Sequence, residues 1–341
     1  MRLIQVGVGG FGSGWTQIVA DSPEFEPVAF VDINKKVLDE MGSTRGMPRN
    51  RRFTSLEAAL AKVEAEAVLI VTPPASHRPL AEAAFKAGLH VLTEKPLAEK
   101  WGDCTAMVRA ARRAERVLMV SQNYRYREAP RTIRGLIDQG AIGSPGYAQL
   151  SFHKAPKFPR SYRLEMDYPL LVDMSIHHFD LMRYVLNANP LSVLCYSFRP
   201  RWSWFKHEPA CQARFHMTKD ILVDYFGSWV SDGAETTWDG DWRIQGDKGC
   251  ILWSQGAVRI AAPGEEARKV TIQTLRRSDR QLSLLEFHQA IVEHRAPETS
   301  GTDNLHSIGM VFAALASAAG GRPKPIPQMA KAPARPKRKK A

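Results

Sequence analysis

The chain has 341 residues, of which 44% are hydrophobic and 24% are charged, and its formal net charge at pH 7 is +12. This length suffices for about two domains of ordinary size, and no stretch approaches the roughly 18 unbroken apolar residues of a membrane helix. Glycines interrupt the N-terminal segment "MRLIQVGVGGFG" almost at once, so it resembles a first strand and turn rather than a signal peptide. A cytoplasmic protein without a membrane partner is therefore expected.

Most of the positive charge lies at the C-terminus. Residues 322–341 carry eight Lys or Arg and no acid, and removing these eight charges from the total leaves +4 for the rest of the chain. A segment rich in Pro and Lys, with little to bury, predicts a disordered basic tail over 329–341. The tail could make weak contacts with nucleic acid or anionic lipid, but a solubilising tail is the simpler interpretation. No other nucleic-acid contact is expected.

The cysteines are widely separated and form no CxxC pair: Cys104, Cys195, Cys211 and Cys250. This spacing argues against both a zinc knuckle and a disulfide framework. Each cysteine is expected to be a small buried hydrophobe.

The first predicted element is a short strand that runs into the turn Gly7-Val8-Gly9-Gly10-Phe11-Gly12 and then into an amphipathic helix. In the spacing G-x-G-x-x-G, Gly7 allows a tight turn and Gly9 lets the backbone approach a pyrophosphate. Gly12 allows the helix to pack closely on the strand, and the helix N-terminus then faces the phosphates. The pattern predicts a dinucleotide site.

The second predicted strand, "PVAFVDI", contains Asp32, twenty residues after Gly12. At the end of this strand the carboxylate can accept hydrogen bonds from both adenosine ribose hydroxyls and repel a 2′-phosphate. NAD is therefore favoured, while Lys35 and Lys36 soften the repulsion and leave NADP possible. The structural alternative is that Asp32 only caps the next helix.

Two more helix–strand units follow. The helix "SLEAALAKV" leads to a strand that stops at Thr72-Pro73-Pro74, and the helix "RPLAEAAFKAG", closed by Gly88, leads to the strand "HVLTEKP". Strands that alternate with helices predict an α/β domain over residues 1–121, a Rossmann-type doubly wound parallel sheet. Since such sheets place their ligand crevice at the carboxyl ends of the strands, Lys95 is expected to point into it.

The pattern changes after a helix expected over 101–114. Runs such as "AIGSPGYAQLSFH" and "ILVDYFGSWV" alternate apolar and polar residues without helices between them, as is typical of antiparallel sheets. We expect an α+β domain over residues 122–328 with a mainly antiparallel open sheet, whose late helices, 282–294 and 304–319, pack on its edges or return to the first domain.

Six of the eight tryptophans fall between Trp202 and Trp253. Aromatic side chains suit a sheet core, a sugar surface or a subunit interface. Because one face of an antiparallel sheet is left uncovered by its own helices, most of these tryptophans are expected at an interface. A homodimer or homotetramer through the second sheet follows.

The most informative stretch of the second half is "LLVDMSIHHFDLMRYVL". On a helix, Asp173 and His177 are at i and i+4, so they project from one face within mutual reach. A carboxylate can orient an imidazole that exchanges a proton near neutral pH, so the pair suits general acid/base work. The structural alternative is a capping Asp173 and a core His177. A metal site with His178 and Asp180 is rejected, because consecutive histidines diverge on a helix.

The order GxGGFG, VDIN, VTPPASH and AGLHVLTEKPLA, followed by D-x-x-x-H, resembles the glucose-fructose oxidoreductase and inositol dehydrogenase family (Gfo/Idh/MocA) up to about Ile326. The resemblance implies an NAD(P)-dependent oxidoreductase that acts on a secondary hydroxyl of a sugar, sugar derivative or cyclitol, and a cis Lys95-Pro96 bond. The implied catalytic residues are Lys95, Asp173 and His177. The expected cofactor-binding residues are Gly7, Gly9, Gly10, Phe11, Gly12, Asp32, Thr72, Pro73, His77, Glu94 and Lys95. The expected substrate-binding residues are Lys95, Arg125, His153, Asp173 and His177.

In the expected mechanism, neutral His177 takes the hydroxyl proton, Lys95 stabilises the developing alkoxide, and Asp173 holds the substrate and orients the imidazole. The loop "HKAPKFPRSYR" adds Lys154, Lys157, Arg160 and Arg163, which fit either an acidic substrate or a plain basic surface. Two other functions stay open: an enzyme that recycles bound NAD to cleave glycosides, and a non-catalytic nucleotide-binding sensor. The substrate, the reacting carbon and the physiological direction are not identified.

Overall fold

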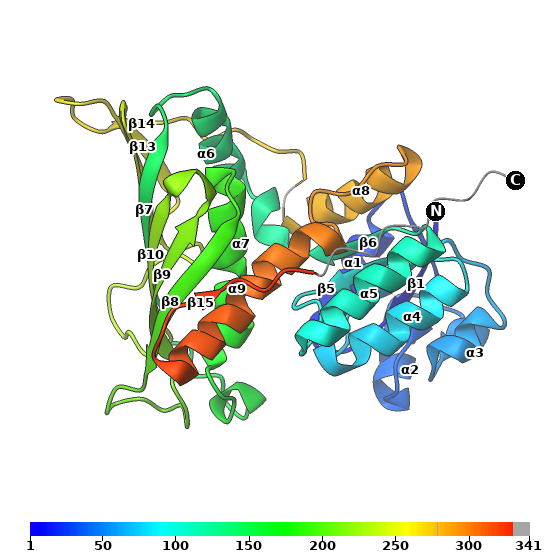
Figure 1. Cartoon of the computed structure of the whole chain (residues 1–341). Helices are drawn as coiled ribbons and strands as arrows, with labels where there is room; N and C mark the ends of the chain where they lie inside the picture. Colours follow the sequence, from blue (N-terminus) through cyan, green and yellow to red (C-terminus); the bar gives the residue numbers. More distant parts are fainter. Residues whose placement is uncertain (278, 330–341) are drawn as a thin grey trace, which may run out of the picture.

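The structure is a computed structural model that describes residues 1–277 and 279–329, so the predicted tail lies outside the described residues from 330 onward. Two sheets stand apart in the molecule, with helices between them (Figure 1). The N-terminal half forms the first sheet and most of its helices, and the rest of the chain forms the second sheet.

The first sheet is parallel throughout and has the strand order β3-β2-β1-β4-β5-β6. Its strands are β1 (Arg2–Val6), β2 (Glu26–Val31), β3 (Arg52–Phe53), β4 (Ala67–Ile70), β5 (His90–Glu94) and β6 (Leu118–Ser121). The helices that connect them are α1 (Phe11–Ala20), α2 (Lys35–Thr44), α3 (Leu56–Leu60), α4 (His77–Lys86) and α5 (Trp101–Ala114). The predicted parallel α/β architecture is confirmed.

Both faces of this sheet are buried, because parallel strands are covered by their crossover helices. The register aligns Leu69 with Leu92 and Leu92 with Met119, and this row packs with Trp15 of α1. Leu284 of α8 (Asp279–Val292) belongs to the same cluster, so a late helix returns to the first sheet. The other face of the sheet packs against α4 and α5.

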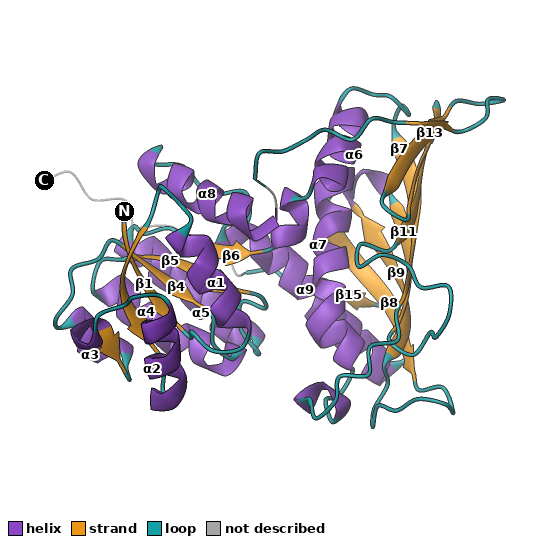
Figure 2. Ribbon diagram, turned by 180° about the vertical axis from the view of Figure 1, so that it is seen from behind, coloured by secondary structure: helices purple, strands orange, loops and turns teal. Residues whose placement is uncertain are grey.

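The second sheet has the order β14-β13-β12-β11-β7-β10-β9-β8-β15 and is antiparallel except for the parallel pair β7 and β10. Its strands are β7 (Pro145–His153), β8 (Pro190–Phe198), β9 (Ala210–Met217), β10 (Leu222–Ser228), β11 (Asp241–Gly246), β12 (Gly249–Ser254), β13 (Ala257–Ala261), β14 (Arg268–Lys269) and β15 (Lys324–Pro325). This confirms the mainly antiparallel sheet. Figure 2 shows the helices on one face of it, and no helix of residues 1–277 and 279–329 on the other.

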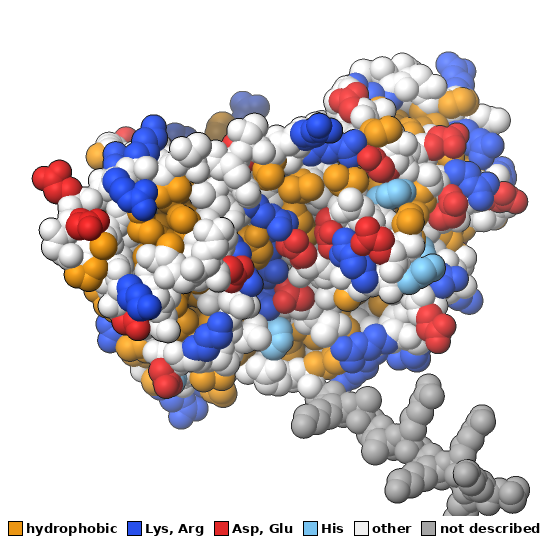
Figure 3. All heavy atoms as spheres, turned by 90° about the horizontal axis from the view of Figure 1, so that it is seen from above, with side chains coloured by type: hydrophobic (Ala, Val, Ile, Leu, Met, Phe, Trp, Pro, Cys, Tyr) orange, Lys and Arg blue, Asp and Glu red, His pale blue; other side chains and the backbone are white. Residues whose placement is uncertain are grey.

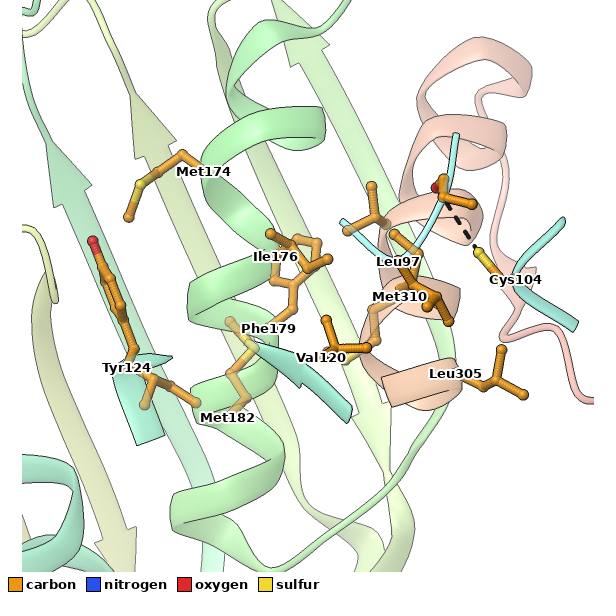
Figure 4. Close-up of a cluster of buried hydrophobic side chains, with 14 of the residues drawn as sticks. Leu97, Cys104, Val120, Tyr124, Met174, Ile176, Phe179, Met182, Leu305 and Met310 are labelled. Carbon is orange, nitrogen blue, oxygen red and sulfur yellow. Dashed lines mark hydrogen bonds between the residues drawn. The ribbon is translucent and has the colours of Figure 1, made fainter. Parts of the chain in front are cut away.

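Three helices fill the space between the sheets: α6 (Glu128–Asp138), α7 (Ser175–Leu186) and α9 (Gly301–Gly320). Helix α7 is buried almost all round because it packs against α6, α9 and the second sheet. In Figure 4, Met310 of α9 lies beside Leu97 and Val120 of the first half. Phe179 of α7 belongs to the same apolar cluster and packs on Phe215 and Tyr225 of the second sheet. One apolar core therefore joins the two halves and fixes α7 relative to the ends of the parallel strands.

All four cysteines are buried and free, as expected. The prediction that most of the clustered tryptophans lie at a subunit interface is wrong. Trp229, Trp242 and Trp253 are at most 3% exposed within the single chain, because Trp242 and Trp253 stack on each other and Trp229 packs on Phe158 and Phe205. Trp202, in contrast, is 71% exposed.

None of the described helices is long and apolar enough to cross a membrane. On the face drawn in Figure 3, basic and acidic side chains are interspersed over both halves. This distribution agrees with the small charge that remains once the basic tail is set aside.

Candidate active site

The glycine turn after β1 has no room for side chains. A Cβ on Gly7, whose φ is +85°, would lie 2.3 Å from the Val71 carbonyl oxygen, and one on Gly12 would lie 2.3 Å from the Gly7 oxygen. A Cβ on Gly9 would lie 2.8 Å from Val37. The turn is therefore pressed against the neighbouring strand end and the start of α1, as a dinucleotide-binding turn requires. These residues fit a bound dinucleotide.

Asp32 stabilises this turn through hydrogen bonds to its backbone. Its Oδ2 accepts hydrogen bonds from the backbone N–H groups of Val8 (3.0 Å) and Gly9 (3.3 Å), and its Oδ1 accepts one from Asn34 N (2.9 Å). Asn34, not Asp32, caps α2. The capping alternative for Asp32 is thus not observed, and the carboxylate lies beside the predicted cofactor site.

Thr72 lies beside Gly7, with its methyl group 3.1 Å from the position of a Cβ there. His77 does not face this space, contrary to the expectation that it contacts the cofactor. It is fully buried, with Nε2 2.8 Å from the Thr72 carbonyl and Nδ1 3.1 Å from the Pro96 carbonyl. His77 therefore joins the loops that follow β4 and β5, and Pro73 is exposed beside it.

Lys95 follows β5, and the Lys95-Pro96 bond is cis, as expected. Its Nζ donates to the backbone oxygen (2.8 Å) and to Oδ1 (3.1 Å) of Asp173. Beneath it, buried Glu94 accepts hydrogen bonds from Trp15 Nε1 (2.8 Å) and from Lys95 N (3.1 Å). Burial raises the pKa of Glu94 despite these donors and the nearby lysine.

Asp173 lies in a π-helical turn, Leu170–Met174, directly before α7. Its Oδ2 accepts a hydrogen bond of 2.6 Å from Arg163 Nε, so both carboxylate oxygens have cationic partners. Burial opposes the charged form, but Lys95 and Arg163 outweigh it and hold the pKa of Asp173 below its ordinary value. Asp173 is thus a fixed anion that holds Lys95.

His177 is held by a ring stack. Its imidazole lies 4.2 Å from the ring of Tyr124 at an angle of 16°, and its buried Nδ1 has no hydrogen-bond partner among the described residues. The expectation that Asp173 orients this imidazole is therefore not met. Burial first, and then the charges of Lys95 and Arg127, lower the pKa of His177 well below its ordinary value.

Arg127 covers the other side of this stack. Its guanidinium carbon lies 3.4 Å from the centre of the Tyr124 ring. Its Nη1 donates to Asp239 at 2.5 Å and its Nε donates to Asp279 at 2.8 Å. Arg127, Tyr124 and His177 thus form a three-layer stack. Asp239 and Asp279 hold this stack in place through their hydrogen bonds with Arg127.

One cleft of about 500 Å³ lies between the two halves, and Lys95, Tyr124, Arg127 and His177 are among the residues that line it. It is formed by side chains from α1, the end of β5, the turn after β6, α7 and the start of α8: Phe11, Ile18, Glu94, Lys95, Asn123, Tyr124, Arg127, His177, Asp279, Arg280 and Gln281. The structure therefore brings the predicted Phe11, Glu94, Lys95 and His177 together. It adds Tyr124, Arg127 and Arg280, to which the sequence reasoning had assigned no role.

Arg125 does not reach the cleft, which is against the expectation that it contacts substrate. Its Nε and Nη2 donate to the two carboxylate oxygens of buried Asp180 at 2.5 and 2.7 Å, and Nη2 also donates to Asp303. Residues 123–126 form a 3₁₀ turn, in which residues three apart lie above one another. Arg127 therefore stacks on Tyr124, while Arg125 points into the core.

His153 also faces away from the cleft, because side chains alternate along a strand. Phe152 points inward, 4.6 Å from the His178 ring, whereas His153 approaches Ser231 Oγ (3.2 Å) and Phe226 on the other side. The expectation of a substrate contact by His153 is corrected accordingly.

His178 belongs to the core: its Nδ1 lies 3.1 Å from Tyr225 Oη, and burial lowers its pKa to about 4. Among the described residues, no group of three or more His, Cys, Asp or Glu could hold a metal ion. In the basic loop, Lys154 pairs with Glu235 and Lys157 lies 3.6 Å from Asp232. Neither lysine lines the cleft, and Arg163 is the loop residue that contacts Asp173.

Comparisons with known proteins agree with this geometry. The family described as "Oxidoreductase family, NAD-binding Rossmann fold" (GFO_IDH_MocA) matches residues 1–122, and the GFO/IDH/MocA C-terminal domain matches residues 130–252. Inositol 2-dehydrogenase 3 of Saccharopolyspora erythraea is 30% identical over 249 residues, which cover 69% of this chain and 70% of that protein. The 1,5-anhydro-D-fructose reductase of Ensifer adhaerens is 28% identical over 285 residues, covering 80% and 83%.

Among solved structures, an oxidoreductase from Agrobacterium radiobacter in complex with NAD+, L-tartaric acid and magnesium is similar over 96% of this chain and 98% of its own. Its TM-score is 0.87 and its sequence identity is 26%.

Proposed function

The chain belongs to the Gfo/Idh/MocA family of NAD-binding oxidoreductases, and on this premise we propose that it transfers a hydride between nicotinamide and a secondary hydroxyl of a sugar, sugar derivative or cyclitol. The observation that carries the proposal is that Lys95 and His177 line one cleft with Phe11 of the glycine turn. The substrate class is supported by the names of the relatives, which include an inositol dehydrogenase and an anhydrofructose reductase.

His177 is proposed as the general base. Its lowered pKa keeps the imidazole neutral near pH 7, and a neutral imidazole can accept the hydroxyl proton. The stack on Tyr124 fixes the plane of the ring, so no carboxylate is needed to orient it. Bound nicotinamide would supply the hydride acceptor, which no side chain can provide.

Lys95 is proposed to stabilise negative charge on the substrate oxygen. An ammonium group has three N–H donors, and Asp173 takes two of them through its backbone and side-chain oxygens. The third donor remains for the oxygen that loses its proton to His177. Asp173, held in turn by Arg163, is proposed to hold Lys95 in place.

The test is the formation of reduced nicotinamide, followed by absorbance, when purified protein and NAD or NADP receive a panel of sugars, sugar acids and inositols. Activity with one compound that falls by orders of magnitude in both Lys95→Met and His177→Asn, with NADH affinity retained, is expected. Near-normal turnover in both variants would refute the assignment. Tightly bound NAD with no net reduction, but with glycoside cleavage, would favour a cofactor-recycling enzyme instead.

A homodimer or homotetramer through the open face of the second sheet is proposed as well. That face exposes Tyr196 (69%) and Leu194 on β8 and, farther along the sheet, the paired Tyr147 and Leu222 on β7 and β10, with the Arg214–Asp224 ion pair between the two groups. Exposed apolar side chains on an uncovered sheet face suit association. Light scattering after gel filtration should give a multiple of 38.1 kDa, and a monomer would contradict the proposal. The buried free cysteines suit a cytoplasmic location.

A further inference from the structure

Arg280, the second residue of α8, lies against the first turn of α1. Its guanidinium carbon is 4.8 Å from the centre of the Phe11 ring and 5.6 Å from that of Trp15. A Cβ on Gly14 would lie 3.2 Å from its Nη1, so the missing side chain at Gly14 lets the guanidinium rest on the helix. A side chain from the late part of the sequence thus reaches the predicted cofactor turn.

Arg280 differs from the other cations of the cleft in its partners. Lys95 is paired with Asp173, and Arg127 is paired with two carboxylates. Within residues 1–277 and 279–329, Arg280 has no carboxylate within ion-pair distance, although it lines the same cleft. A cation without an internal counter-ion, placed in a ligand cleft, is available for an anionic ligand.

The adjacent N-terminus of α1 also lacks a negative partner. Its N-cap residue, Gly10, has no side chain to accept a hydrogen bond, and the first turn contains no acid. The N–H groups of Gly10 and Phe11 donate to no acceptor among the described residues. Helix N-termini with open N–H groups bind phosphates. Two sources of positive potential therefore lie side by side at the start of α1. The carboxylates that line the same cleft have other partners: Glu94 accepts from Trp15 and Lys95, and Asp279 accepts from Asn123 and Arg127.

We propose that Arg280 is a pyrophosphate clamp, which binds the cofactor's pyrophosphate together with the N-terminus of α1. The inference rests on the proposed function, since it assigns Arg280 to the cofactor of that reaction. A planar guanidinium can give two parallel hydrogen bonds to phosphate oxygens, which a lysine cannot. A pyrophosphate carries two negative charges, so it can serve as the counter-ion of both Arg280 and the helix N-terminus.

The proposed clamp residue, Arg280, is linked through its neighbour in the sequence to the proposed base, His177. Asp279, the residue before Arg280, accepts hydrogen bonds from Arg127 and from Asn123, and Arg127 lies on the Tyr124 ring. The first turn of α8 thus contacts the cofactor turn with one residue and the support of His177 with the other. A cofactor bound by Arg280 should therefore make both the cofactor turn and the stack that supports His177 more rigid.

The test is cofactor binding by isothermal titration calorimetry, without substrate, with the full chain carrying Arg280→Gln. The dissociation constants of NADH and ADP-ribose are expected to rise about 10- to 100-fold, the worth of a charge-assisted hydrogen bond. Adenosine, which has no phosphate, should bind as it does to the wild type. Arg280→Lys should recover part of the loss because it restores the charge but not the planar fork.

Arg277→Gln is the matched control. It removes the same charge three residues earlier, where Arg277 pairs with Glu24 at 2.8 Å and does not line the cleft. Its NADH affinity should equal that of the wild type, so an equal loss in both variants would overturn the proposal.

Wild-type affinity of Arg280→Gln for NADH and ADP-ribose would overturn the clamp. Unchanged cofactor binding with a raised KM for an acidic substrate would overturn it too and assign Arg280 to the substrate. Because binding is measured without substrate, a chain that oxidises no sugar but loses NADH affinity in Arg280→Gln would refute the proposed function and support the clamp.

Discussion

Replacing Arg125 by methionine is expected to reduce stability rather than substrate affinity. The side chains of Arg125 and Asp180 are only 7% and 2% exposed, and they share two hydrogen bonds of 2.5 and 2.7 Å. Without the guanidinium, Asp180 keeps a hydrogen bond from Ser307 and a more distant cation, Arg183, at 3.7 Å. The variant therefore leaves a buried carboxylate that is only partly compensated.

Removing one partner of a buried ion pair costs about 3–5 kcal/mol, mostly because the other charge stays buried. The remaining contacts of Asp180 place the expected loss near the lower end, at about 3 kcal/mol in the free energy of unfolding. Urea denaturation at neutral pH measures it. Adding Asp180→Asn to Arg125→Met removes the uncompensated charge and should recover part of the loss, which a double-mutant cycle quantifies.

Arg214→Met is the matched control, because Arg214 forms an equally well-aligned double hydrogen bond with Asp224 on the exposed sheet face. Its side chain is 63% exposed, so little measurable loss of stability is expected. If Arg125→Met unfolds like the wild type while the KM for substrate rises tenfold or more, Arg125 contacts substrate and the structural argument is refuted.

Gly12→Ala would place a Cβ 2.3 Å from the Gly7 oxygen, so loss of NADH binding by calorimetry is expected, and wild-type affinity would contradict the role of the turn. Tyr124→Leu removes the ring that fixes His177, so kcat should fall about 10- to 100-fold with NADH affinity retained; an unchanged kcat would show that the stack is dispensable. Burial lowers the pKa of His178 to about 4, so between about pH 6.5 and 4 the unfolded chain binds a proton that the folded chain does not. The free energy of unfolding should therefore fall by about 3 kcal/mol as pH drops through this range, and His178→Gln should flatten the slope measured by denaturation at several pH values; an equal slope in the variant would contradict this.

The first half of the chain could be predicted closely because local signals determine it. Only a few neighbouring residues are needed to recognise the glycine spacing, the alternation of strands and helices, and the end of β5 at Lys95-Pro96. The helix expected over 101–114, for example, is α5, Trp101–Ala114. The parallel pairing of β7 with β10 could not be read from alternation, because both strand directions give the same period of two. The division at Ser121 stays a prediction, since α8 returns to the first sheet.

The side on which a residue points was the weaker part of the prediction. In "NYRYR" the prediction chose Arg125, whereas the 3₁₀ turn decides that Arg127, three residues after Tyr124, stacks on it. In "LSFH" both Phe152 and His153 suit a half-buried strand, so the sequence does not say which one faces the helices. Contacts between segments far apart, such as Arg127 with Asp279, have no local signal at all.

Asp173 and His177 show how one wrong local assumption changes a mechanism. The spacing i and i+4 places two side chains together only on an α-helix, but the turn that contains Asp173 is π-helical, and its carboxylate is directed to Lys95 and Arg163. A carboxylate beside the imidazole would have raised the pKa of His177, whereas burial and two nearby cations lower it. The base that we propose is thus neutral without a partner, and it is weak. The proton that it would accept must leave again, since an imidazolium beside Lys95 is disfavoured. We therefore propose that stabilisation of the alkoxide by Lys95 is the larger part of the catalytic effect.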